Sequence, residues 1–151
     1  MENKLILLVE DNPDDETLTL RTLGKQKLPC EVAVARDGVE ALDYLFCTGS
    51  YVSRERILPH LVLLDLKLPK VDGLEVLRKL REEPRTRTLP VVVFTSSNES
   101  HDINDSYRFG ANSYIRKPVD YNQFSEAVRL IGQYWLVENL APPPVSLHDN
   151  H

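Results

Sequence analysis

Residues 61–73 read LVLLDLKLPKVDG, and this stretch decides the fold. Four consecutive apolar residues run directly into Asp65, a pattern typical of a parallel strand that is buried on both faces. Pro69 and Gly73 then interrupt the pattern and predict a turn that leads into a helix. Ligands of open α/β sheets bind beyond the carboxyl ends of the strands, so Asp65 is a candidate functional residue. Taken alone, Asp65 is explained about equally well as an ordinary turn residue.

Strand-like and helix-like segments alternate along the rest of the chain. Short apolar runs are typical of buried strands, and apolar residues every three or four positions are typical of helices. The predicted strands cover 4–9, 30–35, 61–65, 89–94 and 112–115, and the predicted helices cover 13–25, 38–48, 74–83, 99–109 and 121–139. Gly49 is the expected C-terminal cap of the second helix. Alternation of this kind predicts an α/β fold in which helices cover both faces of a parallel five-stranded sheet.

The composition indicates one domain of ordinary size. The chain has 151 residues, of which 42% are hydrophobic and 27% are charged. The net charge of -5 and the lack of a basic stretch argue against nucleic acid as the main partner. The longest early apolar run, 5–9, is too short for a signal peptide or a membrane span, so we expect a cytoplasmic protein. Cys30 and Cys47 lack a second ligand pair and are expected to be buried thiols.

The segment after the first strand is rich in acidic residues. Asn12 is a favourable N-cap, and Pro13 suits the first helical position. Acidic residues at 14–16 stabilise the first turn through the helix dipole. A well-capped helix therefore explains residues 14–16, but it does not explain Glu10 and Asp11, which precede the cap.

Polar residues with complementary chemistry follow four of the five predicted strands. The first strand ends in Glu10 and Asp11, the third in Asp65, the fourth in Thr95 and the fifth in Lys117. Three close carboxylates repel each other unless a cation joins them, and ligand sets of oxygen atoms suit Mg²⁺. An ammonium and a hydroxyl would supply further donors to an anion. The set predicts a site that holds a phosphoryl group on a carboxylate with the help of Mg²⁺.

This set of motifs resembles the response-regulator receiver domain of two-component signalling. The resemblance covers residues 4–139, and its motifs are Val9-Glu10-Asp11, Leu64-Asp65 with Pro69 and Gly73 behind it, Thr95-Ser96, and Lys117-Pro118. It implies a flavodoxin-like sheet with strand order 2-1-3-4-5 and a histidine kinase as phosphoryl donor. It also implies a signalling phosphoacceptor, which catalyses only its own phosphorylation and dephosphorylation.

The same resemblance implies a role for each site residue. Asp65 would be the phosphoacceptor, Thr95 would contact the phosphoryl group and Lys117 would pair with it. The Mg²⁺ ligands would be the carboxylates of Glu10, Asp11 and Asp65 and the backbone carbonyl of Lys67. The Lys117–Pro118 peptide bond would be cis.

Two further pairs of residues would control the response. Thr95 and Tyr114 would form a switch, in which the phosphoryl group draws in the Thr95 hydroxyl and Tyr114 turns inward. Lys67 and Ser97, which follow Asp65 and Thr95 at the mouth of the site, would tune the lifetime of the phosphorylated form. For Lys67, an ordinary solvated surface lysine is an equally good explanation.

The C-terminal part is similar to the single-domain regulators of cyanobacterial and bacterial phytochrome kinases. That similarity rests on 117–120, Phe124, 134–136, a proline-rich tail and the long connection at 50–60. Taken alone, this connection is better explained as a tolerated surface insertion. We therefore expect a receiver domain at 1–140 and a flexible tail at 141–151, with a phytochrome kinase as the partner. No residues remain for a DNA-binding output domain, so output should be a protein–protein contact or onward phosphotransfer.

The last predicted helix carries two apolar stripes. One stripe, at Phe124, Val128, Ile131 and Trp135, has the spacing of a surface that faces the core. The second stripe, at Ala127, Leu130, Tyr134 and Val137, would remain as an apolar patch and predicts a homodimer in which each helix contacts its copy. The alternative is a monomer in which the tail folds back over this second stripe.

Two other classes of protein share parts of this pattern. A haloacid-dehalogenase-type phosphatase also phosphorylates an Asp at a strand end, but it needs a second Asp two residues later, where this chain has Lys67. A flavodoxin-type electron carrier shares the sheet, but Glu10 and Asp11 would repel the phosphate of its cofactor. The absence of yellow colour in the purified protein would exclude the electron carrier.

Overall fold

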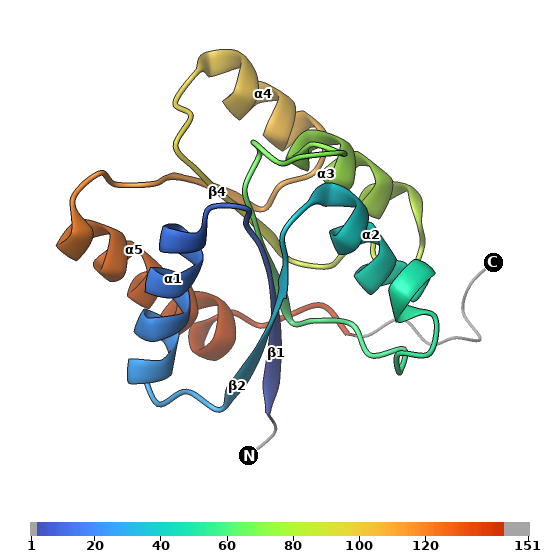
Figure 1. Cartoon of the computed structure of the whole chain (residues 1–151), viewed down its shortest axis with the longest axis horizontal. Helices are drawn as coiled ribbons and strands as arrows, with labels where there is room; N and C mark the ends of the chain where they lie inside the picture. Colours follow the sequence, from blue (N-terminus) through green and yellow to red (C-terminus); the bar gives the residue numbers. More distant parts are fainter. Residues whose placement is uncertain (1–2, 144–151) are drawn as a thin grey trace.

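A five-stranded parallel sheet forms the centre of the protein (Figure 1). The structure is a computed structural model and describes residues 3–143. The strands are β1 (Lys4–Val9), β2 (Cys30–Ala35), β3 (Leu61–Leu64), β4 (Val91–Thr95) and β5 (Ser113–Arg116). Their order across the sheet is β2-β1-β3-β4-β5, and all neighbouring strands are parallel. The predicted flavodoxin-like fold is confirmed.

Helices cover both faces of the sheet (Figure 1). One face carries α1 (Pro13–Lys25) and α5 (Tyr121–Gln133), and the other carries α2 (Gly38–Phe46), α3 (Gly73–Glu82) and α4 (Ser100–Arg108). Alternate residues of β1 face opposite layers, so Ile6 and Leu8 pack with α1 and α5, whereas Leu7 and Val9 pack with α2 and α3. Two buried layers explain why the central strands are apolar without interruption.

The strand register brings the functional strand ends to one edge of the sheet. Val9 lies opposite Leu64 in the β1–β3 pair, and Thr95 lies opposite Arg116 in the β4–β5 pair. The residues that directly follow β1, β3 and β5 therefore leave the sheet at the same edge, where β4 ends in Thr95.

Local hydrogen bonds fix where the helices begin. The Asn12 side chain accepts from the backbone N–H groups of Asp14 and Asp15, and Pro13 occupies the first turn, as predicted. The side chains of Asp37, Asp72 and Asp120 cap α2, α3 and α5 in the same way. Caps of this kind contribute about 1 kcal/mol each to stability.

The end of α2 differs from the prediction. Cys47 takes the left-handed conformation (φ 57°) after the last helical residue, while Gly49 opens the 3₁₀ turn η1 (Gly49–Tyr51). Thr48 stabilises this arrangement because its N–H and its hydroxyl both donate to Asp43. The expectation that Gly49 caps α2 is therefore wrong. Cys47 is buried as expected, whereas Cys30 is only half-buried because it lies on β2, an edge strand.

The end of α5 also differs. The α-helix stops at Gln133 and continues as the π-helical turn η2 (Tyr134–Glu138). The wider turn changes which side chains face the core, so Leu136 is buried and Trp135 is only half-buried. The predicted core stripe is confirmed at Phe124, Val128 and Ile131, and Trp135 packs against the same core but remains partly exposed.

The peptide bond before Pro118 is trans. No peptide bond in residues 3–143 is cis, so the expected cis Lys117–Pro118 bond is wrong. The two isomers of a bond before proline differ by only about 0.5–1 kcal/mol, so the surrounding backbone rather than the dipeptide selects the isomer.

The long connection before β3 is tied to α2. The Arg54 guanidinium lies 3.9 Å from the centre of the Tyr44 ring and donates to the backbone carbonyls of Tyr44 and Ile57. At the end of the connection, the His60 N–H donates to Leu5 O of β1. These contacts hold the connection against the body of the domain.

Candidate functional site

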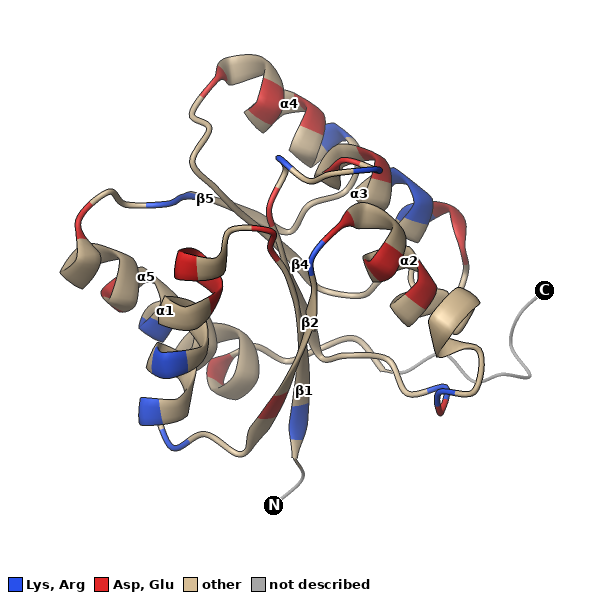
Figure 2. Ribbon diagram, in the orientation of Figure 1, with Lys and Arg blue, Asp and Glu red and all other residues tan. Residues whose placement is uncertain are grey.

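Acidic residues are concentrated along the backbone at the carboxyl edge of the sheet, in the loop after β1 and the first turn of α1 (Figure 2). Glu10 directly follows β1, and Asp65 directly follows β3. The Asp65 N–H donates to Val9 O at 3.1 Å and the Lys117 N–H to Thr95 O at 2.7 Å. These backbone hydrogen bonds fix the positions from which the side chains of Asp65 and Lys117 extend into the site.

Lys117 is the centre of the cluster. Its ammonium donates to Glu10 Oε1 at 2.6 Å, to Asp15 Oδ2 at 2.8 Å and to Asp65 Oδ2 at 2.9 Å. The side chains of Lys117, Glu10 and Asp65 are almost completely buried, so water screens these ion pairs weakly. One ammonium thus holds three carboxylates together.

The second oxygen of Asp65 has its own donors. Asp65 Oδ1 accepts from the Thr95 hydroxyl at 2.7 Å and from the Lys67 N–H at 3.3 Å. The Thr95 hydroxyl therefore already lies against Asp65 when that carboxylate is unmodified. The predicted inward movement of the Thr95 hydroxyl would therefore be small. The hydroxyl would only exchange its acceptor, from the Asp65 carboxylate to a phosphoryl oxygen at the same place.

Gly73 allows α3 to begin directly behind Asp65. A Cβ atom at this position would lie 2.3 Å from Asp65 O and 2.7 Å from Leu66 Cα. The Gly73 N–H donates to Leu66 O at 3.0 Å, which closes the turn after β3. Any larger residue would push α3 away from the site.

The charges of the cluster shift the pKa values of its members. Burial raises the pKa of Glu10 to about 7, against the opposing effect of Lys117. Burial also acts to raise the pKa of Asp65, but the charge and hydrogen bond of Lys117 and the Thr95 hydroxyl outweigh it and lower that pKa. Burial acts to lower the pKa of Lys117, but its carboxylate neighbours raise it above its usual range. Asp65 is therefore held as a carboxylate and Lys117 as an ammonium.

Three of the predicted metal ligands lie close enough to hold one cation. Glu10, Asp11 and Asp65 each offer a carboxylate oxygen, and these oxygens all lie within 4.8 Å of one another. Asp11 is exposed, which leaves one side of the group open to water molecules. A set of oxygen ligands that remains partly open to water fits a hard divalent cation such as Mg²⁺.

Asp15 is a site residue that the sequence analysis missed. Its carboxylate contacts Lys117 from the first turn of α1, and its side chain is about one-quarter exposed. Helix capping alone explained an acidic residue at this position, so nothing in the local pattern marked a second role. The spacing of four residues between Asp11 and Asp15, with the start of a helix between them, is the sequence signal that could have identified Asp15.

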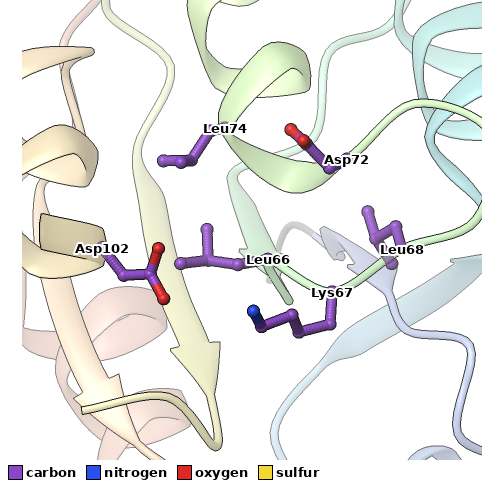
Figure 3. Close-up of a pocket in the computed structure, with 6 residues that line it drawn as sticks. All are labelled: Leu66, Lys67, Leu68, Asp72, Leu74 and Asp102. Carbon is purple, nitrogen blue, oxygen red and sulfur yellow. The ribbon is translucent and has the colours of Figure 1, made fainter. Parts of the chain in front are cut away.

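A pocket lies beside the cluster, and of the predicted switch and lifetime residues Lys67 lines it. The pocket holds about 360 Å³ and is lined by Leu66, Lys67, Leu68, Asp72, Leu74 and Asp102 (Figure 3). The Ser97 hydroxyl donates to Asp102 Oδ2 at 2.5 Å, and the Tyr114 hydroxyl donates to Ser97 O at 2.8 Å. Tyr114 is thereby connected through Ser97 to the first turn of α4. Lys67 is exposed at the mouth of the pocket.

The second stripe of the last helix is largely exposed. Leu130, Tyr134 and Val137 are exposed by 53%, 51% and 51%. Ala127 is half-buried and packs against the core of the α1–α5 layer. An apolar surface with three large side chains thus remains without a cover among residues 3–143.

The sequence matches the response regulator receiver domain family over residues 6–129. Among curated relatives, the probable methanogenesis regulatory protein FilR2 of Methanothrix harundinacea is 41% identical over 93% of this chain and 88% of its own. Response regulator Rcp1 of Synechocystis is 38% identical over 88% of this chain and 89% of its own.

Solved structures agree in fold. The phosphorylated cyanobacterial phytochrome response regulator RcpA matches with a TM-score of 0.89 and 39% identity, over 94% of this chain and all of that chain. The Mn²⁺-bound form of Rcp1 matches with a TM-score of 0.87 and 36% identity, over 93% and 99% of the two chains. The bacteriophytochrome response regulator AtBRR matches with a TM-score of 0.73 and 52% identity, over 95% and 100%. In the described part of this chain, no helix has the length and apolar character of a membrane span.

Proposed function

Because the chain belongs to the response regulator receiver domain family, we propose that Asp65 is the residue that accepts the phosphoryl group from a histidine kinase. The observation that carries the proposal is the pair of donors on Asp65, with Lys117 on one oxygen and Thr95 on the other. Both donors are buried, and both lie where oxygens of an attached phosphoryl group would need them.

The reaction needs little from the protein beyond position and charge. A carboxylate oxygen of Asp65 forms a bond to phosphorus while the bond from phosphorus to the histidine nitrogen of the donor breaks, and that nitrogen keeps the electron pair. The lowered pKa keeps Asp65 ionised as the nucleophile. Lys117 and Thr95 can then donate to the phosphoryl oxygens without a large movement, because they already contact the carboxylate.

The proposal assigns Mg²⁺ to the carboxylates of Glu10, Asp11 and Asp65. The backbone carbonyl of Lys67 is proposed as a fourth ligand. The bound cation would neutralise charge on the phosphoryl oxygens during transfer. Glu10 contributes as a carboxylate only when its proton has left, and with a pKa of about 7 this proton is easily displaced near neutral pH.

Intact-mass measurement after incubation with acetyl phosphate and Mg²⁺ tests the assignment. Wild-type protein should gain one phosphoryl group, and Asp65→Asn should gain none. Asp14→Asn is a matched control, because Asp14 is an exposed acidic residue of the neighbouring helix and does not contact Lys117. Equal labelling of Asp65→Asn and wild type would place the phosphoacceptor elsewhere. Labelling that is unaffected by EDTA would exclude the Mg²⁺ requirement.

The proposed partners are a phytochrome-type histidine kinase and a second copy of this chain. Phytochrome or bacteriophytochrome regulators among the relatives, at 39% and 52% identity, support the choice of kinase. Faster transfer from a phytochrome kinase than from an unrelated histidine kinase is the expected result, and equal or slower transfer would contradict it. The uncovered stripe at Leu130, Tyr134 and Val137 supports the homodimer. A cytoplasmic location belongs to the proposal, because the kinase takes its phosphoryl group from cytoplasmic ATP.

A further inference from the structure

One buried carboxylate of α4 holds the loop between β4 and α4. Asp102 Oδ2 accepts from the Ser97 hydroxyl at 2.5 Å, and the Tyr114 hydroxyl donates to Ser97 O at 2.8 Å. Ser97 therefore contacts Asp102 through its side chain and Tyr114 through its carbonyl. We propose that Asp102 is a positioning residue for the switch: it acts through Ser97 and holds Tyr114 in the place that Tyr114 has while Asp65 is unmodified.

The start of α4 lacks the cap that the other α-helices have. Within residues 3–143, an Asn or Asp side chain accepts from a first-turn N–H in α1, α2, α3 and α5. The N-cap residue of α4, Glu99, makes no such hydrogen bond with its side chain. Its N–H instead donates to the Ser97 hydroxyl oxygen at 3.2 Å, and that hydroxyl donates to Asp102. Ser97 and Asp102 together therefore fix the start of this helix in place of a cap.

Burial strengthens the contact between Asp102 and Ser97. The Asp102 side chain is only 10% exposed, and it points from α4 into the pocket that Leu66 and Lys67 also line (Figure 3). A hydrogen bond to a carboxylate is stronger than one between neutral groups, and weak screening by water strengthens it further. The other oxygen of Asp102 lies 3.4 Å from Nε2 of His101, whose side chain is exposed. The contact with Ser97 is therefore the one that water weakens less.

This contact gives Asp102 an influence on the response to phosphorylation. The inference rests on the proposed phosphorylation of Asp65 and on the proposed switch, in which Tyr114 turns inward. Tyr114 is already half-buried and donates to Ser97 O while Asp65 is unmodified. Because Asp102 stabilises this arrangement, the unmodified protein already favours the position to which phosphorylation leads. Without Asp102, Tyr114 should turn outward until phosphorylation draws it back.

Ring resonances of Tyr114 in the unmodified protein test the positioning. Asp102→Ala and Ser97→Ala should each move these resonances in the same direction, and the double variant should move them no further, because both changes break one contact. Loss of a charged hydrogen bond should shift the equilibrium between the two Tyr114 positions by about tenfold. Ser97→Thr keeps the hydroxyl and should resemble wild type. Asp105→Ala is the matched control, because this carboxylate of α4 pairs with Arg108 instead of the loop.

The response to phosphorylation is the second measurement. Asp102→Ala should still gain a phosphoryl group from acetyl phosphate, because the contacts of Asp102 lie in α4 and the loop before it rather than at Asp65. Intact mass measures this gain and also shows that the variant is folded. The movement of the Tyr114 resonances on phosphorylation should then be at least about twice that of wild type, since the variant starts from the outward position.

Four results would overturn the role of Asp102. They are unmoved Tyr114 resonances in unmodified Asp102→Ala, additive effects in the double variant, a response no larger than that of wild type, and loss of labelling in Asp102→Ala alone. Absence of label in wild type would instead contradict the proposed phosphoacceptor. The first measurement would still decide the role of Asp102 in that case, because it uses the unmodified protein.

Discussion

At the scale of single residues, the site is organised by one buried ammonium. Lys117 contacts Glu10, Asp15 and Asp65, which come from the ends of two strands and from the start of a helix. Each carboxylate limits the directions in which the ammonium can point. The position of Lys117 toward a phosphoryl group on Asp65 would therefore also depend on Glu10 and Asp15.

We expect Asp15→Asn to slow phosphorylation of Asp65. The amide cannot hold the ammonium as a carboxylate does, and loss of one charged hydrogen bond at a partly exposed position is worth about 1 kcal/mol, or roughly fivefold in rate. The measurement is the rate of labelling by acetyl phosphate under excess Mg²⁺. Asp14→Asn is the control, since it removes the same charge one residue earlier. Equal rates for the two variants would mean that Asp15 serves the helix alone.

We expect Lys67→Ala to shorten the lifetime of the phosphorylated protein. Lys67 follows Asp65 closely and is exposed at the mouth of the adjoining pocket, where its long chain can crowd the path of the attacking water molecule (Figure 3). The measurement is the loss of label over time after removal of the donor. Lys70→Ala is the control, because this exposed lysine belongs to the same loop but does not line the pocket. A lifetime equal to or longer than that of wild type would make Lys67 an ordinary surface residue.

At the scale of elements, the ends of β4 and β5 connect the site to α4. Thr95 ends β4 and contacts Asp65, while Tyr114 of β5 donates to Ser97 in the β4–α4 loop. Ser97 in turn donates to Asp102 of α4. A change at Asp65 can therefore reach a helix on the surface through two strands and one loop.

Thr95→Ala should uncouple this path without blocking phosphorylation. The variant loses the hydroxyl that contacts Asp65, while Lys117 and the carboxylates remain in place. We expect the variant to be labelled. We expect the changes in the amide resonances of Ser97 and Tyr114 on phosphorylation to fall by at least about half, because the Thr95 hydroxyl would no longer interact differently with the two states. Thr95→Ser keeps the hydroxyl and should respond as wild type does. A full response in Thr95→Ala would show that coupling takes another route.

At the scale of the whole molecule, the last helix divides its apolar residues between two tasks. Phe124, Val128 and Ile131 pack against the sheet, so the fold does not require the exposed stripe. Leu130, Tyr134 and Val137 remain at the surface, each about half exposed. Aromatic residues such as Tyr134 are common anchors in protein interfaces.

Leu130→Glu should convert the expected dimer to a monomer. A carboxylate at the centre of the apolar contact would lose its water without gaining a partner, so at least about tenfold weaker association is expected. Light scattering at tens of micromolar measures the mass of wild type and variant, with and without phosphorylation. Asn122→Glu is the control, because it adds the same charge to α5 at an exposed position away from the stripe. A monomeric wild type would refute the homodimer, and a dimeric Leu130→Glu would move the interface elsewhere.

The tail remains the alternative cover for this stripe. Most of the predicted tail at 141–151 lies outside the described residues, which end at 143. A chain truncated after Asn139 distinguishes the two arrangements. If the tail covers the stripe in a monomer, truncation should increase self-association. If the protein is a dimer formed through the stripe, the truncated chain should remain a dimer.

The sequence by itself determined the sheet and the candidates for the site. Strand and helix periods are local properties, and in parallel strands every carboxyl end lies at one edge. The residues that follow the strands, from Glu10 to Lys117, could therefore be grouped before any contact was known. The tertiary structure decided the contacts that depend on distant parts of the chain. Asp15 approaches Lys117 across 102 positions, and Thr95 already donates to Asp65. Leu136 is buried beside the partly buried Trp135 because the helix widens after Gln133. Local patterns could not reveal these features, because each depends on where a second element packs and on which conformations that packing leaves favourable.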